Sequence, residues 1–593
     1  MSAVLIEEHG EQIFTRFDTR VVSRLWLFVR PYRAVLWGGV LSVVAYTAAQ
    51  VAIPVTVRHA IDSMLGAPAS LDGIVAVFAA LVALNGVLNF LQEWVAARLA
   101  QRVIFDLRRA MFAHLQDVSL STLDQTQVGR LMARLAGDVN ALQEFLETSV
   151  SAVGDLFLLV GIVVVLLWMD LQLGLLTLAA LPALLLTRIV WLPWAREKFR
   201  RAREASSSVN ASLAENINGI RTVQENRRQD VNYTRYEVKA SDNRDAQIGA
   251  SRASQVMVPL VDTLTGIAMA VVVVAGGHAV MGGSLGVGVM VAFIFYVQKF
   301  FDPIRTLSMQ YTVMQRAMAA GQRIFEVLDV PLQIVDRPGA VDLPATFEPS
   351  VEFRHVRFAY RPGQVVLHDL DLTIAAHQTV ALVGPTGSGK TTVTALLRRF
   401  YEVGSGDVRV GGHDVRDLTI DSLGRQIGMV LQEPFLFSGT ILDNIRFGLP
   451  GASREDAVAA ARAVRADTFI ERLPLGYDTP LGQRGRNLSI GQRQLISFAR
   501  ALLADPKILI LDEATANIDS FTEQEIQHAL ALLRQGRTTI IIAHRLATVR
   551  DADLIVVLDR GRILEQGNHE ALIARGGLYA RLQASSRVSF DEP

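Results

Sequence analysis

The sequence contains no cysteine, very little lysine and no net charge. Without cysteine among its 593 residues, the chain cannot build disulfide scaffolds, thiolate zinc sites or thiol nucleophiles. Its 58 basic residues balance 58 acidic ones, which leaves no basic excess for neutralising phosphates, so we expect no nucleic-acid partner. Only five of the basic residues are lysines, at positions 198, 239, 299, 390 and 507.

Hydrophobic residues, by contrast, make up 50% of the chain, and the mean hydropathy is +0.30. That value excludes a disordered chain and is too high for an ordinary soluble enzyme. The length predicts about three or four domains. Long runs with at most one charge are each sufficient to cross a bilayer, and the glycine-rich run at 263–298 is long enough for a hairpin. We predict six membrane-spanning helices, near 34–57, 73–92, 148–169, 171–187, 254–279 and 286–305.

The charges around these runs predict the orientation of the chain. Residues 1–11 are acidic and no short apolar run with a cleavage site follows, so we predict no signal peptide. Residues 21–33 are typical of an amphipathic helix at the membrane interface, ending near Pro31. Arginine clusters fall on one side of the predicted spans. The chain is therefore predicted to be a multi-pass protein of the cell (plasma or inner) membrane with both termini and the C-terminal half in the cytoplasm.

Two long inner connections keep helical periodicity and contain no proline. We expect membrane helices to continue about 40 Å into the cytosol and to turn near 119–127 and 215–223. A linker with prolines at 331, 338, 344 and 349 then leads to a more polar segment. The predicted organisation is a cytoplasmic N-terminus with an interfacial helix (1–33), a six-helix transmembrane domain (34–330), a linker (331–350) and a C-terminal domain (351–593).

Four charged residues lie within the predicted spans, where they are costly unless they face other helices or a cavity. Pairing between helices, or a position near the water interface, is favoured over contact with a transported compound. The four are Asp155, Asp262, Lys299 and Asp302.

The second half alternates β-branched runs with helix-like segments, which predicts an α/β domain with a parallel sheet flanked by helices. The runs are VEFRHVRFAY, TVALVG, ILILD, TTIIIAH and LIVVLD. The whole chain is thus expected to be multi-domain, with an all-α transmembrane domain followed by an α/β domain.

A phosphate-binding loop follows the run TVALV and precedes the helix-like TTVTALLRRF, which is the context that this motif requires. Its glycines allow backbone N–H groups to surround a β-phosphate, and the helix N-terminus adds partial positive charge. Lys390 supplies a compact charge for the β- and γ-phosphates that the broad arginine fork would supply poorly. Thr391 would bind Mg²⁺. The predicted ATP-binding residues are Gly384, Pro385, Thr386, Gly387, Ser388, Gly389, Lys390, Thr391 and Thr392.

Two acids end the apolar run at 508–511. Asp512 is predicted to emerge at the carboxyl end of a buried strand and to orient Mg²⁺, and Glu513 to polarise the attacking water.

Over residues 351–585 the sequence resembles the ATP-binding-cassette family. Residues 488–492, which read LSIGQ, are similar to the family signature LSGGQ. Gln432 stands at the Q-loop position, where the resemblance assigns it to the Mg²⁺ site, and residues 516–520, with Asp519, resemble the D-loop. His544 corresponds to the switch histidine, and Tyr360 to the aromatic residue that stacks on adenine. The signature residues are Leu488, Ser489, Ile490, Gly491 and Gln492.

In this family two cassettes dimerise head to tail, so that the signature of one chain covers the ATP of the other. One cassette and six spans then imply a dimer with twelve spans, in which 119–127 and 215–223 resemble the coupling helices. Ile490 replaces a glycine of the signature while Glu513 is intact. This combination resembles one subunit of heterodimeric members, so a heterodimer is favoured over a homodimer.

The layout resembles type IV exporters. It implies export of amphipathic or hydrophobic compounds, drug or lipid, by alternating access driven by ATP and Mg²⁺. An importer or lipid flippase on the same fold, and an ATP-gated channel or regulator, are the alternatives.

Overall fold

The computed structural model describes residues 18–65, 71–124, 126, 128–344, 346–512, 520–543 and 549–588. These residues divide into two compact units. One contains the described residues up to Leu115 together with Gly129–Asp329, and the other contains Gln116–Val128 together with the residues from Val330 onward.

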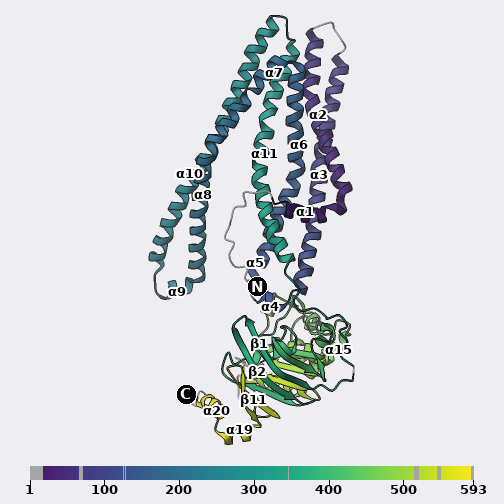
Figure 1. Ribbon diagram of the computed structural model, residues 1–593, viewed down its shortest axis with the longest axis vertical. Helices are drawn as coiled ribbons and strands as arrows, with labels where there is room; N and C mark the ends of the chain where they lie inside the picture. Colours follow the sequence, from purple (N-terminus) through teal and green to yellow (C-terminus); the bar gives the residue numbers. More distant parts are fainter. Residues whose placement is uncertain are drawn as a thin grey trace. The chain divides into compact units, whose positions relative to one another are not determined.

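The first unit is built of helices (Figure 1). Six helical stretches of the described chain are long and apolar enough to cross a membrane, which confirms the predicted number of spans. The helices of this unit are α1 (Thr19–Val29), α2 (Arg33–Leu65), α3 (Leu71–Asp117), α5 (Val128–Ala133), α6 (Val139–Met169), α7 (Leu171–Leu178), α8 (Ala180–Asn218), α9 (Ile220–Glu225), α10 (Gln229–Met281) and α11 (Val287–Leu328).

Helix α1 is the predicted amphipathic helix. Asp18 caps it by accepting a hydrogen bond from the Arg20 N–H, and its buried residues Val21, Leu25 and Val29 recur every four positions. The helix ends just before Pro31, which lies in a 3₁₀ turn. Its buried stripe packs among residues of α3, α6 and α11.

The turn between α10 and α11 is shorter than the glycine cluster suggested. Gly276 and Gly277 lie inside α10, and the chain reverses only at 282–286, where Gly283 has φ +74°. A Cβ at Gly276 would lie 3.2 Å from Met290 of α11, so this glycine permits close packing of two helices and does not form the turn.

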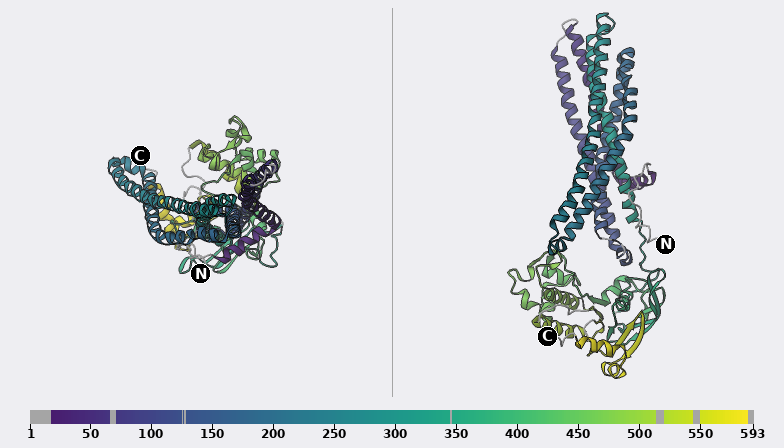
Figure 2. Two further views of the ribbon diagram at one scale, coloured as in Figure 1. Left: turned by 90° about the horizontal axis from the view of Figure 1, so that it is seen from above. Right: turned by 90° about the vertical axis from the view of Figure 1, so that its left-hand side faces the viewer.

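Helices α8 and α10 lie side by side over most of their length (Figures 1 and 2). The predicted reversal at 215–223 comes slightly later, because α8 continues to Asn218 and the chain turns over 219–228. Several large apolar residues of this hairpin are exposed in the single chain: Leu213, Ile217, Ile220, Val231, Val238 and Ile248.

The predicted intramembrane charges differ in exposure. Asp155 and Lys299 are half-buried, whereas Asp262 and Asp302 are exposed. Both assignments made for them, pairing between helices and contact with a transported compound, stay predictions.

The second unit contains two main sheets. Five parallel strands and one antiparallel edge strand form a sheet of order β12-β11-β3-β10-β9-β6. The run VEFRHVRFAY is not part of it. It forms β1 of an antiparallel sheet of order β2-β1-β4-β5, a correction to the single parallel sheet expected. The strands are β1 (Val351–Arg361), β2 (Gln364–Ile374), β3 (Thr379–Val383), β4 (Ser405–Val410), β5 (His413–Asp414), β6 (Ile427–Val430), β7 (Gly439–Thr440), β8 (Pro480–Leu481), β9 (Ile508–Asp512), β10 (Thr538–Ile542), β11 (Leu554–Asp559) and β12 (Arg562–Gly567).

Helices complete this unit, and α4 belongs to it although it precedes the linker in sequence. They are α4 (Leu120–Leu123), α12 (Lys390–Leu397), α13 (Ile420–Gln426), α14 (Ile441–Arg446), α15 (Arg454–Ala463), α16 (Asp467–Ile470), α17 (Ile490–Ala504), α18 (Ser520–Arg534), α19 (His569–Arg575) and α20 (Leu578–Val588).

The central strands are buried on both faces, as their continuous apolar runs predict. Alternate residues enter two different cores. Val380 and Leu382 pack with residues of α12 on one face, and Ala381 and Val383 pack with residues of α17 on the other. The phosphate-loop helix and the signature helix therefore lie on opposite faces of one sheet.

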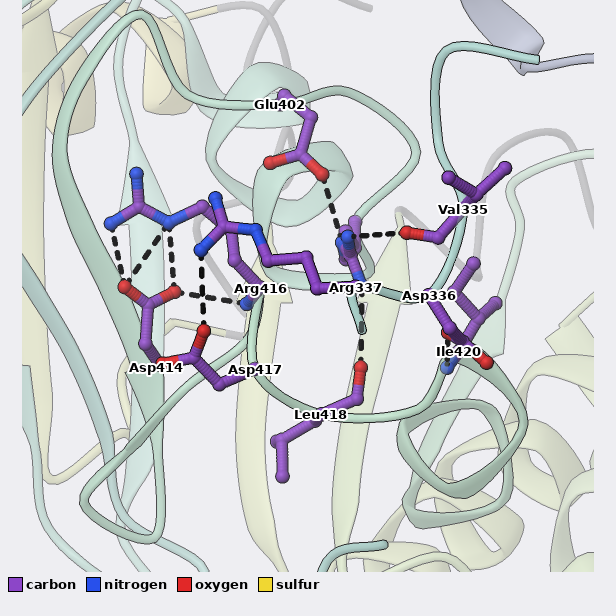
Figure 3. A network of polar contacts seen from close by, with 10 residues as sticks. Val335, Asp336, Arg337, Glu402, Asp414, Arg416, Asp417, Leu418 and Ile420 are labelled. Atoms are coloured by element: carbon purple, nitrogen blue, oxygen red, sulfur yellow. Dashed lines mark hydrogen bonds and ion pairs between the residues drawn. The ribbon is translucent and has the colours of Figure 1, made fainter. Parts of the chain in front are cut away.

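Arg399 joins the linker to the rest of the second unit. Its side chain is 2% exposed; Nη2 donates to the Val335 carbonyl (3.0 Å), Nη1 to the Leu418 carbonyl (3.2 Å) and Nε to Glu402 (2.9 Å). Figure 3 shows these acceptors within a wider network, in which Asp336 also accepts a hydrogen bond from the Ile420 N–H.

Replacing Arg399 with leucine is expected to lower the free energy of unfolding of this unit by about 3 kcal/mol, because two carbonyls and a carboxylate lose a buried donor. Guanidinium unfolding followed by fluorescence would measure it. Arg425→Leu is the matched control, since the Arg425–Asp421 pair is exposed and its loss is expected to cost less than about 1 kcal/mol. Equal effects of the two substitutions would contradict the assignment.

Candidate functional site

The phosphate loop connects β3 to α12, as the sequence predicts. Gly384 has φ +153°, and a Cβ there would lie 2.0 Å from the Leu558 carbonyl oxygen, so no other residue fits. Gly389 precedes the helix with φ +103°. These two glycines allow the loop to curve back over the helix N-terminus, where the first N–H groups of a helix are suited to binding an anion.

The side chains of the loop are suited to phosphate. Lys390 is 5% exposed, and its ammonium donates to the carbonyls of Gly384 (2.8 Å) and Pro385 (3.0 Å). The Ser388 hydroxyl is buried and has no hydrogen-bond partner among the residues that the structure describes. A buried hydroxyl and ammonium beside a helix N-terminus form a donor set that a triphosphate would satisfy.

The oxygen ligands expected for Mg²⁺ come from neighbouring strands. Asp512 ends β9 and pairs in register with Ile542 of β10, which pairs in turn with Leu382 of β3. Asp512 is thus two strands, or about 10 Å, from the strand that leads into the phosphate loop. Gln432 follows β6, which neighbours β9, and it is exposed, as is Thr391 at the start of α12. Carboxylate, amide and hydroxyl oxygens near one sheet edge fit a magnesium ion.

Tyr360, predicted to stack on adenine, is 41% exposed at the end of β1. Its hydroxyl shares a hydrogen bond with Thr392 of the phosphate-loop helix (3.0 Å), which brings these two predicted ATP-binding residues together. Its ring makes edge-to-face contacts with Phe358 and Tyr401. An exposed aromatic ring held beside the phosphate loop is suited to stacking on a base.

The signature residues form the start of α17. Ser489 and Gln492 make a reciprocal capping box, in which the Ser489 oxygen accepts from the Gln492 N–H (3.2 Å) and the Gln492 oxygen from the Ser489 N–H (3.0 Å). Leu488 and Gly491 are buried, whereas Ile490 is 42% exposed at the first helical position. Because α17 and α12 lie on opposite faces of the sheet, the chain does not place its own signature over its own phosphate loop.

Three predicted elements lie outside the described residues. They are the proposed catalytic base Glu513, the D-loop with Asp519, and His544. The described residues stop at Asp512, the last residue of β9, and at Ala543, the residue after β10.

Two polar residues near the site were not predicted. Helix α12 ends at Leu397, three residues before the end of the helix-like run, in a Schellman motif with Arg399 at φ +54°. After this turn the Arg399 side chain donates a hydrogen bond to the Val335 carbonyl of the linker. The Tyr401 hydroxyl donates a hydrogen bond to Asp124. No pattern in the sequence at 398–401 indicates either of these contacts.

Comparison with known proteins covers most of the chain. Residues 36–304 match the family described as ABC transporter transmembrane region, and residues 367–516 match the family ABC transporter. The uncharacterized ABC transporter ATP-binding protein YknV of Bacillus subtilis is 40% identical over 95% of this chain and 94% of its own length. An ATP-dependent lipid A-core flippase of Syntrophus aciditrophicus is 38% identical over 84% of this chain and 83% of its own.

A fatty acid ABC transporter ATP-binding/permease protein of Mycobacterium tuberculosis is 38% identical over 83% of this chain and 78% of its own. Among solved structures, a bacterial Atm1-family ABC exporter with ATP bound superposes with a TM-score of 0.76 and 30% identity, covering 93% of this chain and 98% of that one.

Proposed function

The chain belongs to the ABC transporter family, and we propose that it is one half of a dimeric exporter that moves amphipathic or hydrophobic compounds out of the cytoplasmic side of the membrane. It is a multi-pass membrane protein with a cytoplasmic ATPase domain, and it couples ATP hydrolysis to transport. The observation that carries the proposal is a complete phosphate loop in the same chain as six apolar spans.

The names of its relatives support a lipid-like compound. Proteins of similar sequence are a lipid A-core flippase, a fatty acid transporter and a putative multidrug export protein of Bacillus subtilis. What these compounds share is a large apolar part.

In the proposed hydrolytic site, Lys390 holds the β- and γ-phosphates, and Thr391, Gln432 and Asp512 hold Mg²⁺. The ion supplies charge neutralisation on the transferred phosphoryl group. Glu513 would accept the proton of the attacking water, and His544 would act as the switch histidine. Tyr360 would stack on adenine, and Asp519 is proposed as the acidic residue of the D-loop.

The site requires a second cassette, because the signature helix and the phosphate loop lie on opposite faces of the sheet. The exposed apolar residues of the α8–α10 hairpin also favour a partner chain that covers them. We propose a heterodimer: the signature of this chain, altered at Ile490, would cover the weaker ATP site, and Glu513 would serve the stronger one.

Replacing Ile490 with glycine tests the heterodimer proposal. The Ile490 side chain is exposed where a γ-phosphate of the partner's ATP would approach the helix N-terminus. Its removal is expected to raise ATP hydrolysis by the purified complex about twofold, since the γ-phosphate at the second site would approach the existing backbone donors without meeting this side chain. Phosphate release measures it, and purification from the native membrane identifies the second subunit. Unchanged hydrolysis would mean that isoleucine is tolerated at this position.

Transport by inside-out vesicles tests the export proposal and its alternatives. The probes are doxorubicin, labelled palmitate and labelled phosphatidylethanolamine, supplied on the cassette side with ATP and Mg²⁺. We expect ATP-dependent accumulation or leaflet transfer of at least one probe away from the cassette side. Movement towards the cassettes would identify an importer, and ion conductance without accumulation would identify a channel.

A further inference from the structure

Three segments of the second unit meet just beyond the phosphate-loop helix. The first is the tip of the first cytosolic hairpin, residues 116–124 at the end of α3 and in α4. The second is the linker, and the third consists of the residues that follow α12. We name this meeting point the junction, and it consists of Ser121, Asp124, Gln333, Val335, Arg399 and Tyr401.

Each pair of segments in the junction shares a polar contact. The Ser121 hydroxyl donates to Gln333 (2.8 Å), which joins the hairpin tip to the linker. Arg399 holds the linker carbonyl of Val335, and the Tyr401 hydroxyl donates to the Asp124 carboxylate. Burial and this carboxylate raise the pKa of Tyr401, so its hydroxyl stays protonated and remains a donor at neutral pH.

The same tyrosine contacts the candidate adenine-stacking residue. The ring centroids of Tyr401 and Tyr360 are 5.0 Å apart with planes at 88°, an edge-to-face contact, and buried Phe358 closes a three-ring cluster. Tyr360, Tyr401, Asp124 and Thr391 all line one cavity of about 890 Å³. Two aromatic rings in contact, those of Tyr401 and Tyr360, therefore connect the hairpin carboxylate to the proposed nucleotide.

We propose that Tyr401 is a positioning residue that links nucleotide binding at Tyr360 to the tip of the first cytosolic hairpin. An adenine stacked on Tyr360 would restrict the motion of that ring. Through the edge-to-face contact, the motion of the Tyr401 ring would be restricted as well, and the hydrogen bond from its hydroxyl to Asp124 would become more stable. By thermodynamic linkage, the state of the hairpin in turn alters the affinity for ATP. This inference rests on the ATP site of the proposed function, but it does not depend on which compound is transported.

Hydrogen exchange of the full-length complex in nanodiscs tests the link, with adenylyl imidodiphosphate and Mg²⁺ as the ligand. In the unmodified protein we expect the amides of 116–124 to exchange roughly three- to tenfold more slowly when the nucleotide is bound, the effect of one hydrogen bond. Tyr401→Phe should lose most of this difference while residues 384–392 keep their own protection. A purely structural tyrosine would change exchange equally with and without nucleotide.

Matched variants sharpen the test. Tyr477→Phe is the control, because the Tyr477 hydroxyl is buried in the same unit and has no hydrogen-bond partner within the described part of the chain, so its loss should leave the difference unchanged. Asp124→Asn keeps an acceptor and should retain part of the difference, whereas Asp124→Leu should lose it. A normal difference in Tyr401→Phe, or protection of 384–392 without any at 116–124, would overturn the proposal. No protection at 384–392 would contradict the ATP site itself and the proposal with it.

Discussion

Replacing Lys390 with alanine is expected to lower ATP hydrolysis by the purified complex at least about 100-fold, because a preorganised charge facing the transferred phosphate is lost. The ammonium already occupies the loop, bonded to the carbonyls of Gly384 and Pro385, so ATP finds it in place. The same substitution should weaken ATP binding. Phosphate release measures the first effect, and fluorescence of a labelled ATP measures the second.

Lys390→Arg separates charge from shape. At 5% exposure the loop has no room for the wider guanidinium, so we expect arginine to lose most of the activity despite its charge. Lys507→Arg is the matched control, since Lys507 lies over the ring of Phe347 (5.0 Å), a contact that arginine also makes. Activity of Lys390→Arg near that of the unmodified protein would contradict the need for a compact charge.

Local patterns in the sequence were sufficient for much of this architecture. Long apolar runs with few charges predicted the six spans, because a helix that crosses lipid must present mostly apolar side chains. The motif around Lys390 predicted the phosphate loop, since each of its glycines has a positive φ that other residues rarely adopt. The buried strands β3, β9, β10 and β11 also fell where the runs of β-branched residues predicted.

Features that depend on distant residues were not predictable. The run at 351–360 has the composition of a buried strand, but only its pairing with β2 and β4 places it in an antiparallel sheet. The run at 391–400 has helical periodicity, yet α12 stops at Leu397 because Arg399 finds acceptors in the linker and at Leu418. Gly276 resembled a turn residue and instead serves helix packing.

In the candidate site, too, local sequence predicted some residues, and contacts between distant residues could not be predicted. Order and spacing after the phosphate loop were enough to propose Asp512, since strands of a parallel sheet end at one edge, whereas Gln432 was proposed from the family resemblance. The contact between Tyr401 and Asp124 joins residues 277 positions apart, and no local pattern encodes such a pair.

Glu513→Gln is expected to lower ATP hydrolysis by about 100- to 10,000-fold while ATP binding is retained, because the amide keeps the shape of the side chain but cannot accept a proton from water. Asp512, the preceding residue, ends β9 and would still bind Mg²⁺, so the nucleotide should remain bound. Retained ATP should hold the two cassettes together, and the complex should therefore accumulate in its ATP-bound state. Phosphate release, and the amount of ATP that remains with the complex after gel filtration, would measure the two effects.

Glu570→Gln is the matched control, since this glutamate is exposed in the first turn of α19 and its substitution should leave hydrolysis unchanged. The two proposed ATP sites make the result informative about the dimer as well. In a heterodimer whose weaker site contributes little, Glu513→Gln in this chain alone should abolish transport of every probe that the unmodified complex moves. In a homodimer, complexes that mix one altered and one unmodified chain should keep a measurable share of hydrolysis. Normal turnover in the altered complex would refute Glu513 as the base and would require another residue near Asp512 to activate the water.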